Sequence, residues 1–449
     1  MVNDHILFIN PWIYDFAAYD FWVKPLGLLY CARYFEKHGY RCSLIDCVHR
    51  DAVHSAKDGK FNTGKFTAEI IEKPDILKQV PRHYRRYGIS PEEFRNRLAA
   101  IAEQPAAIFF TCIMTYWYPG LRDAVLIAKE VFPDVPFVLS GIYAKLCTDH
   151  ARDTIPVDHI MTGNAEAQAL RLLDSFSQRT RPSYDPFDIR TLDRPAYHLY
   201  DSLSSVSMTT SLGCPLHCQY CASSLLQPVF IERAPEHVLK EIDYYINAFS
   251  VTDIALYDDA LLLHPEQRII PLLKEIIRRN YGLRFHTPNG LHIREITDEL
   301  AELAYAAGFK TLRLSFESSH IQRQADSSWK VTNDDFVRAL ASLKKAGFGN
   351  NEIGVYMMIG LPEQAPEEIE ASIAFIHDHG VRINTVQYSP IPETAYYNRY
   401  LARDLDPVVH NNSIFPFAQT AFEYEQYQKI KNHIRELNAR IMERGEGST

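Results

Sequence analysis

A repeated order of short apolar segments and helical segments constrains the fold of this chain more than any other feature. Six strand-like segments alternate with helical ones at 206–211, 253–258, 284–288, 311–317, 353–360 and 383–389. Several of the intervening helices stop at a glycine, as at Gly308, Gly347 and Gly380, and a strand follows soon after. Glycine readily adopts the left-handed conformation that ends a helix. Six strand–helix units in series predict a partial (β/α)6 barrel, with its chemistry at the carboxyl ends of the strands.

The first third of the chain shows the same alternation in a shorter form. Buried strands are predicted at 5–10, 41–46, 106–112, 136–141 and 158–163, with helices at 26–39, 119–132 and 164–176. This order predicts a parallel α/β sheet of the Rossmann or flavodoxin-like type, covered by helices on both faces. Residues 47–104 interrupt the order as an insertion. Its basic segment 78–97 is either a solvated face or a lid over an anionic ligand.

A chain of 449 residues is too long for one core of ordinary size, and four parts are expected. They are an α/β domain at 1–176, a linker at 177–204, the barrel at 205–395 and a helical C-terminal extension at 396–449. The linker is predicted from its content of arginine, serine, aspartate and proline.

The composition excludes several classes of protein. The net charge of −9 gives no general attraction to nucleic acid, so no nucleic acid is expected as a partner. The longest apolar run, 106–114, is too short for a membrane span. Asp4 lies where a signal peptide would be basic, so a cytoplasmic location is expected. Five of the eight cysteines are scattered among apolar residues, as small buried side chains usually are.

The other three cysteines form a compact group directly after the first barrel strand. Cys214, Cys218 and Cys221 lie within the segment 211-SLGCPLHCQYCAS-223, and no cysteine follows them. An iron–sulfur cubane is normally held by four thiolates, so three would leave one iron open to another ligand. Zinc is the alternative, but His217 adjoins Cys218 and no second Cys/His pair follows at finger spacing. A chance grouping of structural cysteines is the third interpretation.

The Cys-x3-Cys-x2-Cys spacing, with aromatic Tyr220 before the last cysteine, resembles the radical S-adenosylmethionine (radical SAM) enzymes. The resemblance implies a [4Fe-4S] cluster on Cys214, Cys218 and Cys221, whose open iron is chelated by the methionine end of SAM. It implies that reductive cleavage of SAM gives a 5′-deoxyadenosyl radical, which abstracts hydrogen from a small-molecule substrate. It also implies an electron donor such as flavodoxin or ferredoxin.

The ends of the later strands extend this resemblance over about residues 205–395. In 257-YDDA-260 a pair of aspartates takes the place of the family's two glycines and glutamate at the methionine amine, and 287-TPNGLH-292 looks like its Asn-Gly turn. The segment 359-IGLPE-363 resembles the adenine-binding strand, and 389-SPIPET-394 resembles a frequent Ser-Pro-x-Pro-Gly-Thr segment, with Glu393 in place of glycine. With Tyr220, the candidate SAM-binding residues are Asp258, Asp259, Asn289, Glu317 and Gly360.

The N-terminal part resembles the cobalamin-binding domain of the cobalamin-dependent radical SAM class, through 9-INPW-12 and 25–46. The residues that the resemblance places near cobalamin are Asn10, Ser140, Gly141 and Gly163. The Asp-x-His-x-x-Gly sequence of His-ligated cobalamin proteins is absent, because 46-DCVHRD-51 has His49 one place late and no glycine. Cobalt is therefore expected to bind without a protein imidazole. The alternative is a flavodoxin-like domain used for packing or substrate recognition.

The resemblance implies cobalamin-dependent methyl transfer to an unactivated carbon or phosphorus centre, in which one SAM remethylates cobalamin and a second supplies the radical. One alternative is a cobalamin-independent radical SAM rearrangement or ring-forming enzyme. Another, from a different class, is a non-catalytic iron–sulfur redox or sensor protein. The sequence identifies neither the substrate nor a catalytic residue beyond the cofactor-binding groups.

Overall fold

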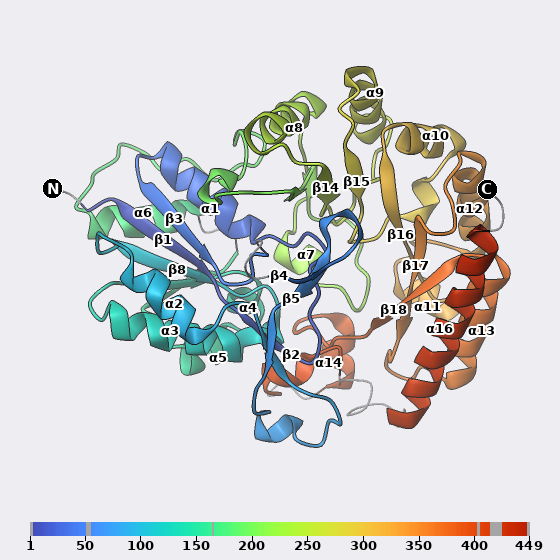
Figure 1. The fold of residues 1–449 in the computed structure, drawn as a ribbon, viewed down its shortest axis with the longest axis horizontal. Coiled ribbons are helices and arrows are strands. Elements are labelled where there is room, and N and C mark those ends of the chain that lie inside the picture. The colour runs from blue at the N-terminus through green and yellow to red at the C-terminus, as the bar shows by residue number, and fades with distance from the viewer. Residues whose placement is uncertain (1–2, 51–54, 164–165, 402–404, 414–423, 447–449) are drawn as a thin grey trace. The chain divides into compact units, whose positions relative to one another are not determined.

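A computed structural model describes residues 3–50, 55–163, 166–401, 405–413 and 424–446 of the chain. The described residues fall into two compact units (Figure 1). Unit 1 comprises Met1–Leu203 and Asp404–Asn411, and unit 2 comprises Ser204–Arg403 and Asn412–Thr449. The first two residues of the expected helix 164–176 and residues 414–423 of the expected C-terminal extension lie outside the described residues.

Unit 1 is built on a five-stranded parallel sheet in the order β10-β9-β8-β1-β3. The strands are β1 (His5–Asn10), β3 (Arg41–Asp46), β8 (Ala107–Thr111), β9 (Phe137–Ser140) and β10 (His159–Ile160). The helices are α1 (Leu26–Lys37), α2 (Pro91–Ala99), α3 (Tyr118–Val131), α4 (Ile142–Leu146), α5 (Thr148–Thr154) and α6 (Glu166–Phe176). The predicted parallel α/β domain is confirmed, and all five expected strands are present.

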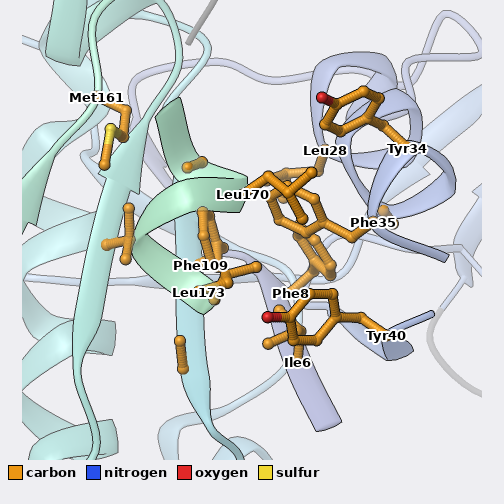
Figure 2. Close-up of a cluster of buried hydrophobic side chains, with 14 of the residues drawn as sticks. Ile6, Phe8, Leu28, Tyr34, Phe35, Tyr40, Phe109, Met161, Leu170 and Leu173 are labelled. Atoms are coloured by element: carbon orange, nitrogen blue, oxygen red, sulfur yellow. The ribbon is translucent and has the colours of Figure 1, made fainter. Parts of the chain in front are cut away.

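One face of this sheet packs against α1 and α6, as Figure 2 shows. Because successive side chains of a strand point to opposite faces, Ile6 and Phe8 of β1 lie on the same side. They meet Phe35 of α1 and Leu170 of α6 in one buried cluster, in which the rings of Phe8 and Phe35 lie 6.0 Å apart. This apolar layer holds the two helices against the sheet. The carboxyl edge of the sheet, where open α/β sheets bind ligands, is thereby held in a fixed position.

The insertion forms small antiparallel sheets beside the main one. Its strands are β4 (Ser55–Asp58), β5 (Gly64–Phe66), β6 (Ala68–Ile70) and β7 (Arg85–Tyr87), and β7 also pairs with β2 (Ile13–Asp15). Short 3₁₀ helices occur at Lys60–Asn62 and Asp75–Leu77. Several basic residues of segment 78–97 have acidic partners in the same unit: Arg86 with Glu69, Arg95 with Glu130, Arg97 with Glu93 and Lys78 with Asp75. These pairs favour the interpretation of the basic segment as a charged surface over that of a lid.

Residues 177–203, expected as a linker, instead belong to unit 1. The hydroxyl of Tyr34 donates to the Asp185 carbonyl at 2.6 Å, and the hydroxyl of Tyr200 donates to Asp46 Oδ2 at 2.6 Å. A 3₁₀ helix at Tyr197–Leu199 lies in the same segment. The segment was predicted to be a linker because most of its residues are polar. The few aromatic side chains that attach it to unit 1 are widely spaced in the sequence and form no periodic pattern.

A short return segment near the C-terminus also belongs to unit 1. It contains a 3₁₀ helix at Pro407–His410, and Asn411 donates to the buried carboxylate of Asp15 at 2.8 Å. The hydroxyl of Tyr118 donates to Asp406 at 2.9 Å. The expected C-terminal extension is therefore divided between the two units.

Unit 2 is built on a six-stranded parallel sheet in the order β11-β14-β15-β16-β17-β18. Its strands are β11 (Ser205–Met208), β14 (Asp253–Leu256), β15 (Arg284–His286), β16 (Phe309–Glu317), β17 (Ile353–Ile359) and β18 (Arg382–Gln387), with a small pair β12 (Ser211–Leu212) and β13 (Ile231–Glu232). The strand order does not close on itself, so the predicted partial barrel is confirmed (Figure 1).

Helices follow the strands of unit 2. They are α7 (Ser223–Leu226), α8 (Pro235–Phe249), α9 (Ile269–Arg279), α10 (Asp298–Ala306), α11 (Ile321–Asp326), α12 (Asn333–Lys345), α13 (Pro366–Asp378), α14 (Ala395–Tyr400) and α16 (Tyr424–Glu446), with a 3₁₀ helix at Ile293–Glu295. Glycines 308, 347 and 380 have positive φ angles, as their expected role at helix ends requires. No helix within the described ranges has the length and apolar character needed to cross a bilayer.

The open edge of the barrel, at β18, is covered by the C-terminal helix α16. Asn438 accepts a hydrogen bond from Ile383 N at 2.9 Å and donates one to Ile383 O at 2.9 Å. One side-chain amide thus replaces a neighbouring strand at this residue. Covering an exposed strand in this way prevents it from pairing with another chain.

Candidate active site

The three clustered cysteines lie on a loop at the carboxyl end of β11, where the sequence placed them. The loop leaves β12 at Gly213, whose φ is +82°. A Cβ at this glycine would lie 2.9 Å from Gln227 Cγ and 3.0 Å from the carbonyl oxygen of Val229. Gly213 therefore lets the loop pass close to the chain that follows α7.

The three thiols face a common region. All three cysteines are half-buried and free. Burial raises the pKa of Cys214 to about 11, and the nearby thiols of Cys218 and Cys221 act in the same direction. The Cys218 thiol also donates to the Ser327 carbonyl at 3.3 Å, and Ser223 N donates to Cys221 Sγ at 3.4 Å.

Zinc is the other metal that a group of cysteines commonly binds. A zinc ion holds its ligands within about 2.3 Å of one metal, which brings them into mutual contact. Among the described residues, no group of three His, Cys, Asp or Glu side chains is close enough to hold a single ion. A four-iron cluster instead takes one thiolate on each iron, so its cysteines stand further apart. Three free thiols on one loop fit a four-iron cluster whose remaining iron is open to another ligand.

Gln219 fastens the cysteine loop to two other parts of the barrel. Its backbone N–H and its side-chain amide both donate to Asp326, to the carbonyl and the carboxylate, at 3.0 Å each. Its carbonyl accepts from Tyr396 N at 2.9 Å. Tyr220 packs against the buried cluster of Met358, Leu361, Tyr388 and Tyr396 at the ends of β17 and β18. These contacts hold the loop over the carboxyl ends of the strands, as in barrels whose chemistry lies there.

Glu317 lies at the end of β16 in a buried ion pair that the sequence did not reveal. Its carboxylate accepts from Lys330 Nζ at 2.6 Å, and both side chains are almost fully buried. Glu317 has a φ of +67° beside an irregularity in the β16–β17 register, a strained conformation that occurs often at functional sites. Burial raises the pKa of Tyr220 far above its usual value, with Glu317 and Cys218 acting in the same direction. Glu317 and Lys330 therefore lie beside the cysteine loop, near its residue Tyr220.

The two adjacent aspartates at the end of β14 have different surroundings. Asp258 is fully buried and accepts from Thr210 N at 3.0 Å, Thr210 Oγ1 at 2.7 Å and Ser211 Oγ at 2.6 Å. Arg268 Nη1 lies 3.5 Å from the same carboxylate. These contacts use the carboxylate of Asp258 within the fold, where it fixes the chain directly after the first strand; its predicted contact with SAM stays a prediction.

Asp259 remains the candidate of this pair. It is exposed, whereas Asp258 is buried. Desolvation by the surrounding protein raises the pKa of Asp259, and the negative charge of the Asp258 carboxylate acts in the same direction. Asp259 also acts on the Cys214 thiol, so it lies on the side of the cysteine loop.

The other candidate positions lie at strand ends as expected. Asn289 donates to the Tyr257 carbonyl at 2.9 Å and so joins the ends of β15 and β14. Gly290 follows with a φ of +85°, and a Cβ there would lie 2.3 Å from Ser315 Oγ. Gly360 has a φ of +79° directly after β17. Glu393 has a φ of +69°. It therefore adopts the left-handed conformation that favours glycine, the residue found at this position in the resembled Ser-Pro-x-Pro-Gly-Thr segment.

His292 is a further group that sequence reasoning missed. It lies directly before the 3₁₀ helix Ile293–Glu295, in the loop after β15. Burial lowers its pKa to about 4, and the nearby positive charge of Lys330 acts in the same direction. A neutral imidazole therefore lies on the Lys330 side of the site. The segment 287-TPNGLH-292 contains it, but a single histidine after a turn carries no signal of its own.

The carboxyl edge of the unit 1 sheet holds a polar network around Asp46. Asn10 donates to Asp46 Oδ1 at 2.7 Å, and Tyr200 donates to Asp46 Oδ2 at 2.6 Å. Lys24 Nζ lies 3.4 Å from Nδ1 of His49, whose ring packs 4.8 Å from that of Tyr200. Asn10, a candidate for cobalamin contact, thus uses its side-chain N–H group in a hydrogen bond to Asp46.

The two candidate glycines of unit 1 differ in what surrounds them. A Cβ at Gly141 would lie 2.5 Å from Thr111 Oγ1, and its φ is +98°, so its own turn requires glycine. Gly163 is exposed, and among the described residues the atom found near its missing Cβ is Lys145 Nζ at 3.7 Å. Ser140 donates to the Phe110 carbonyl at 3.3 Å. Of these two candidate glycines, Gly163 has the less crowded surroundings among the described residues.

The chain is similar to known proteins in both sequence and fold. Residues 208–376 match the model of the radical SAM superfamily. An uncharacterized methyltransferase of Pyrococcus horikoshii is 24% identical over 310 residues, which cover 62% of this chain and 66% of that protein. The cytidylyl-2-hydroxyethylphosphonate methyltransferase of Streptomyces wedmorensis is 20% identical over 424 residues, covering 79% of this chain and 73% of that protein.

Two solved structures share the fold of most of the chain. The radical SAM methyltransferase TsrM of Kitasatospora setae, with tryptophan substrate and a SAM analogue bound, superposes with a TM-score of 0.64 at 15% identity, covering 88% of this chain and 75% of that one. The cobalamin-dependent radical SAM enzyme OxsB superposes with a TM-score of 0.58 at 12% identity, covering 97% of this chain and 61% of that one. The fold, the cysteine loop at the barrel's carboxyl end and the match over 208–376 lead to one assignment: this chain is an enzyme with a radical SAM domain at residues 208–376.

Proposed function

We propose that this protein cleaves SAM at a [4Fe-4S] cluster and uses cobalamin to transfer a methyl group to an unactivated centre of a small-molecule substrate. The observation that carries the proposal is the cysteine loop: three free, half-buried thiols at the carboxyl end of the barrel, within the residues that match the radical SAM model. Cys214, Cys218 and Cys221 would hold the cluster. When bound, the cluster supplies the electron that cleaves SAM.

The residues around the loop would then hold SAM itself. Asp259 is the available carboxylate for the methionine ammonium, and Tyr220 packs beside the loop. Glu317 is fixed by Lys330 and offers a second carboxylate oxygen, which can accept from a ribose hydroxyl or an ammonium. Asn289 and Gly360 shape the neighbouring strand ends.

Replacing Glu317 with alanine is expected to weaken SAM binding by about 1–3 kcal/mol, the usual value of a hydrogen bond to a charged group. Equilibrium dialysis of SAM against the reconstituted protein measures this loss. Asp259→Asn is expected to weaken binding in the same range. Glu352→Ala is the matched control, because Glu352 pairs with Lys310 at the other end of β16. SAM affinity that is unchanged in both Glu317→Ala and Asp259→Asn would remove these carboxylates from the site.

The cobalamin part of the proposal is supported by fold and by relatives. TsrM and OxsB have been solved with cobalamin bound, and they share the fold of both units of this chain. TsrM and the two relatives found by sequence are methyltransferases. Their named substrates, tryptophan and a cytidylyl phosphonate, differ, so the relatives leave the substrate open. Unit 1 would offer its sheet edge, with Gly163 and the network of Asn10, Asp46 and Tyr200.

An anaerobic absorbance spectrum of the reconstituted protein, with and without hydroxocobalamin, tests the proposal. Iron–sulfur absorption together with retained corrin absorption after gel filtration is the expected result. Cleavage of SAM under a strong reductant is expected in addition. Cluster and SAM cleavage without corrin retention would favour a cobalamin-independent radical SAM reaction. A cluster that leaves SAM uncleaved would favour a redox or sensor protein.

Bound cob(II)alamin is expected to show no nitrogen hyperfine splitting from His49. The His49 ring packs on Tyr200, and its Nδ1 lies 3.4 Å from Lys24 Nζ. The imidazole is therefore held by contacts within the protein and is not expected to bind the cobalt. Electron paramagnetic resonance of the wild type and of His49→Ala measures this, and the two spectra should agree. A splitting that disappears in His49→Ala would mean that this histidine binds the cobalt.

A low-potential donor such as flavodoxin or ferredoxin is proposed as the physiological source of electrons. A cytoplasmic location is proposed with it. All eight cysteines lie in the described part of the chain and are free thiols there, which suits a reducing compartment. Reduction of the purified protein by either donor, followed by SAM cleavage, is the direct test of the first proposal.

A further inference from the structure

A turn of unusual conformation follows α11 and approaches the cysteine loop. Ser328 and Trp329 both have positive φ angles, +59° and +51°, although neither is glycine. Two consecutive side-chain-bearing residues in the left-handed region are uncommon and cost conformational energy. Hydrogen bonds from Ser328 N to the Ala325 carbonyl at 3.0 Å and from Trp329 N to the Gln324 carbonyl at 2.9 Å hold the turn. The fold therefore maintains a strained turn just before Lys330.

The turn places the ammonium of Lys330 in the interior, against the cysteine loop. Lys330 Nζ lies 2.6 Å from Glu317 Oε1 and 5.8 Å from the centre of the Tyr220 ring. The same turn meets the loop through Ser327, whose carbonyl accepts from the Cys218 thiol, and it follows Asp326, which binds Gln219. Lys330 is thus surrounded by one carboxylate, one aromatic face and the region of the thiols.

The charge of this lysine is retained despite burial. Burial lowers the pKa of Lys330, but the carboxylate of Glu317 and the thiols of Cys218 and Cys221 outweigh it and raise the pKa above its usual value. A buried ammonium is costly unless it is paired. Glu317 supplies one counter-charge, and deprotonated cysteines on a cluster would add further negative charge near the ammonium.

We propose that Lys330 is a positioning residue that holds a fixed positive charge beside the iron–sulfur cluster and makes the cluster easier to reduce. The inference rests on the proposed function, in which Cys214, Cys218 and Cys221 carry the cluster. The potential of such a cluster depends on the net charge and hydrogen bonds around it. Uptake of one electron makes the cluster more negative, and a nearby cation stabilises that form. The negative charge of Glu317, paired with the ammonium at 2.6 Å, limits the effect.

The test is a redox titration of the reconstituted protein without SAM, with dithionite as the electron source and the reduced cluster followed by electron paramagnetic resonance. Lys330→Met is expected to make reduction at least tenfold less favourable, a shift of about 59 mV to more negative potential for a one-electron couple. Lys330→Arg keeps the charge and is expected to stay close to the wild type. Lys310→Met is the matched control, because Lys310 pairs with Glu352 at the other end of β16.

Glu317→Gln provides an independent arm. Removing the carboxylate while keeping the ammonium is expected to shift the potential in the positive direction, and Lys330→Met/Glu317→Gln is expected between the two single variants. If Lys330→Met does not retain iron, the shift in reduction potential of Glu317→Gln alone tests the role of Lys330. Potentials of Lys330→Met or Glu317→Gln equal to that of Lys310→Met would overturn the role of Lys330. A wild-type protein that holds no four-iron cluster would instead overturn the proposed function.

Discussion

Replacing Cys214, Cys218 or Cys221 with alanine is expected to abolish SAM cleavage and to remove most of the bound iron and sulfide. The three thiols lie on one loop and interact with one another, and the carboxylates near them, Asp259 and Glu317, are poor substitutes for a thiolate on iron. Iron and sulfide analysis of anaerobically reconstituted protein gives the cluster content. Chromatographic detection of 5′-deoxyadenosine gives the SAM cleavage.

Cys112→Ala is the control for these variants. Cys112 is a buried, free thiol at the end of β8 in unit 1, and burial raises its pKa far above the usual value. It is expected to keep the cluster content of the wild type. The interpretation fails if the triple variant Cys214→Ala/Cys218→Ala/Cys221→Ala still holds a full complement of iron and sulfide, or if the bound metal is zinc.

Replacing Asp258 with alanine is expected to destabilise unit 2 by about 3–5 kcal/mol, the usual cost of removing one partner of a buried ion pair. Arg268 is almost completely buried and would lose its fully buried counter-ion. Thr210 and Ser211 would lose the acceptor that fixes the chain directly before the cysteine loop. The free energy of unfolding in urea, followed by circular dichroism, measures the effect.

The adjacent residue supplies the comparison for this prediction. Asp259 is exposed, so Asp259→Ala is expected to change the free energy of unfolding by less than about 0.5 kcal/mol. Equal unfolding free energies for Asp258→Ala and Asp259→Ala would show that the buried carboxylate contributes no stability. The same pair of variants separates the two roles that the sequence could not tell apart, support of the fold and contact with SAM.

The sequence predicted the regular parts of the fold well, because they follow from local periodicity. The strands expected at 5–10 and 41–46 coincide with β1 and β3, and all six barrel strands lie within the expected segments or within two residues of them. Helix ends at Gly308, Gly347 and Gly380 were recognisable because left-handed helix ends favour glycine. The cysteine trio was equally visible, and the radical SAM assignment that it suggested was confirmed.

The parts of the site that the sequence did not reveal depend on partners distant in the chain. Which of Asp258 and Asp259 is buried is decided by Thr210 and Arg268, and neither aspartate differs from the other in its local pattern. Lys330 could not be found, because the turn before it uses serine and tryptophan at positive φ, where sequence gives no warning. The predicted SAM and cobalamin contacts stay predictions.

The return segment 405–411 has a consequence for how the protein is made. Unit 1 needs Asp406, His410 and Asn411 for its contacts with Tyr118, Thr115 and Asp15. These residues leave the ribosome about 200 residues after Leu203, a delay of about 10–40 s at ordinary rates of synthesis. During that interval the carboxylate of Asp15, which is buried in the finished unit, lacks one of its donors. The N-terminal unit therefore receives its last contacts only after most of unit 2 has been synthesised, and a fragment cut at Leu203 would lack these contacts.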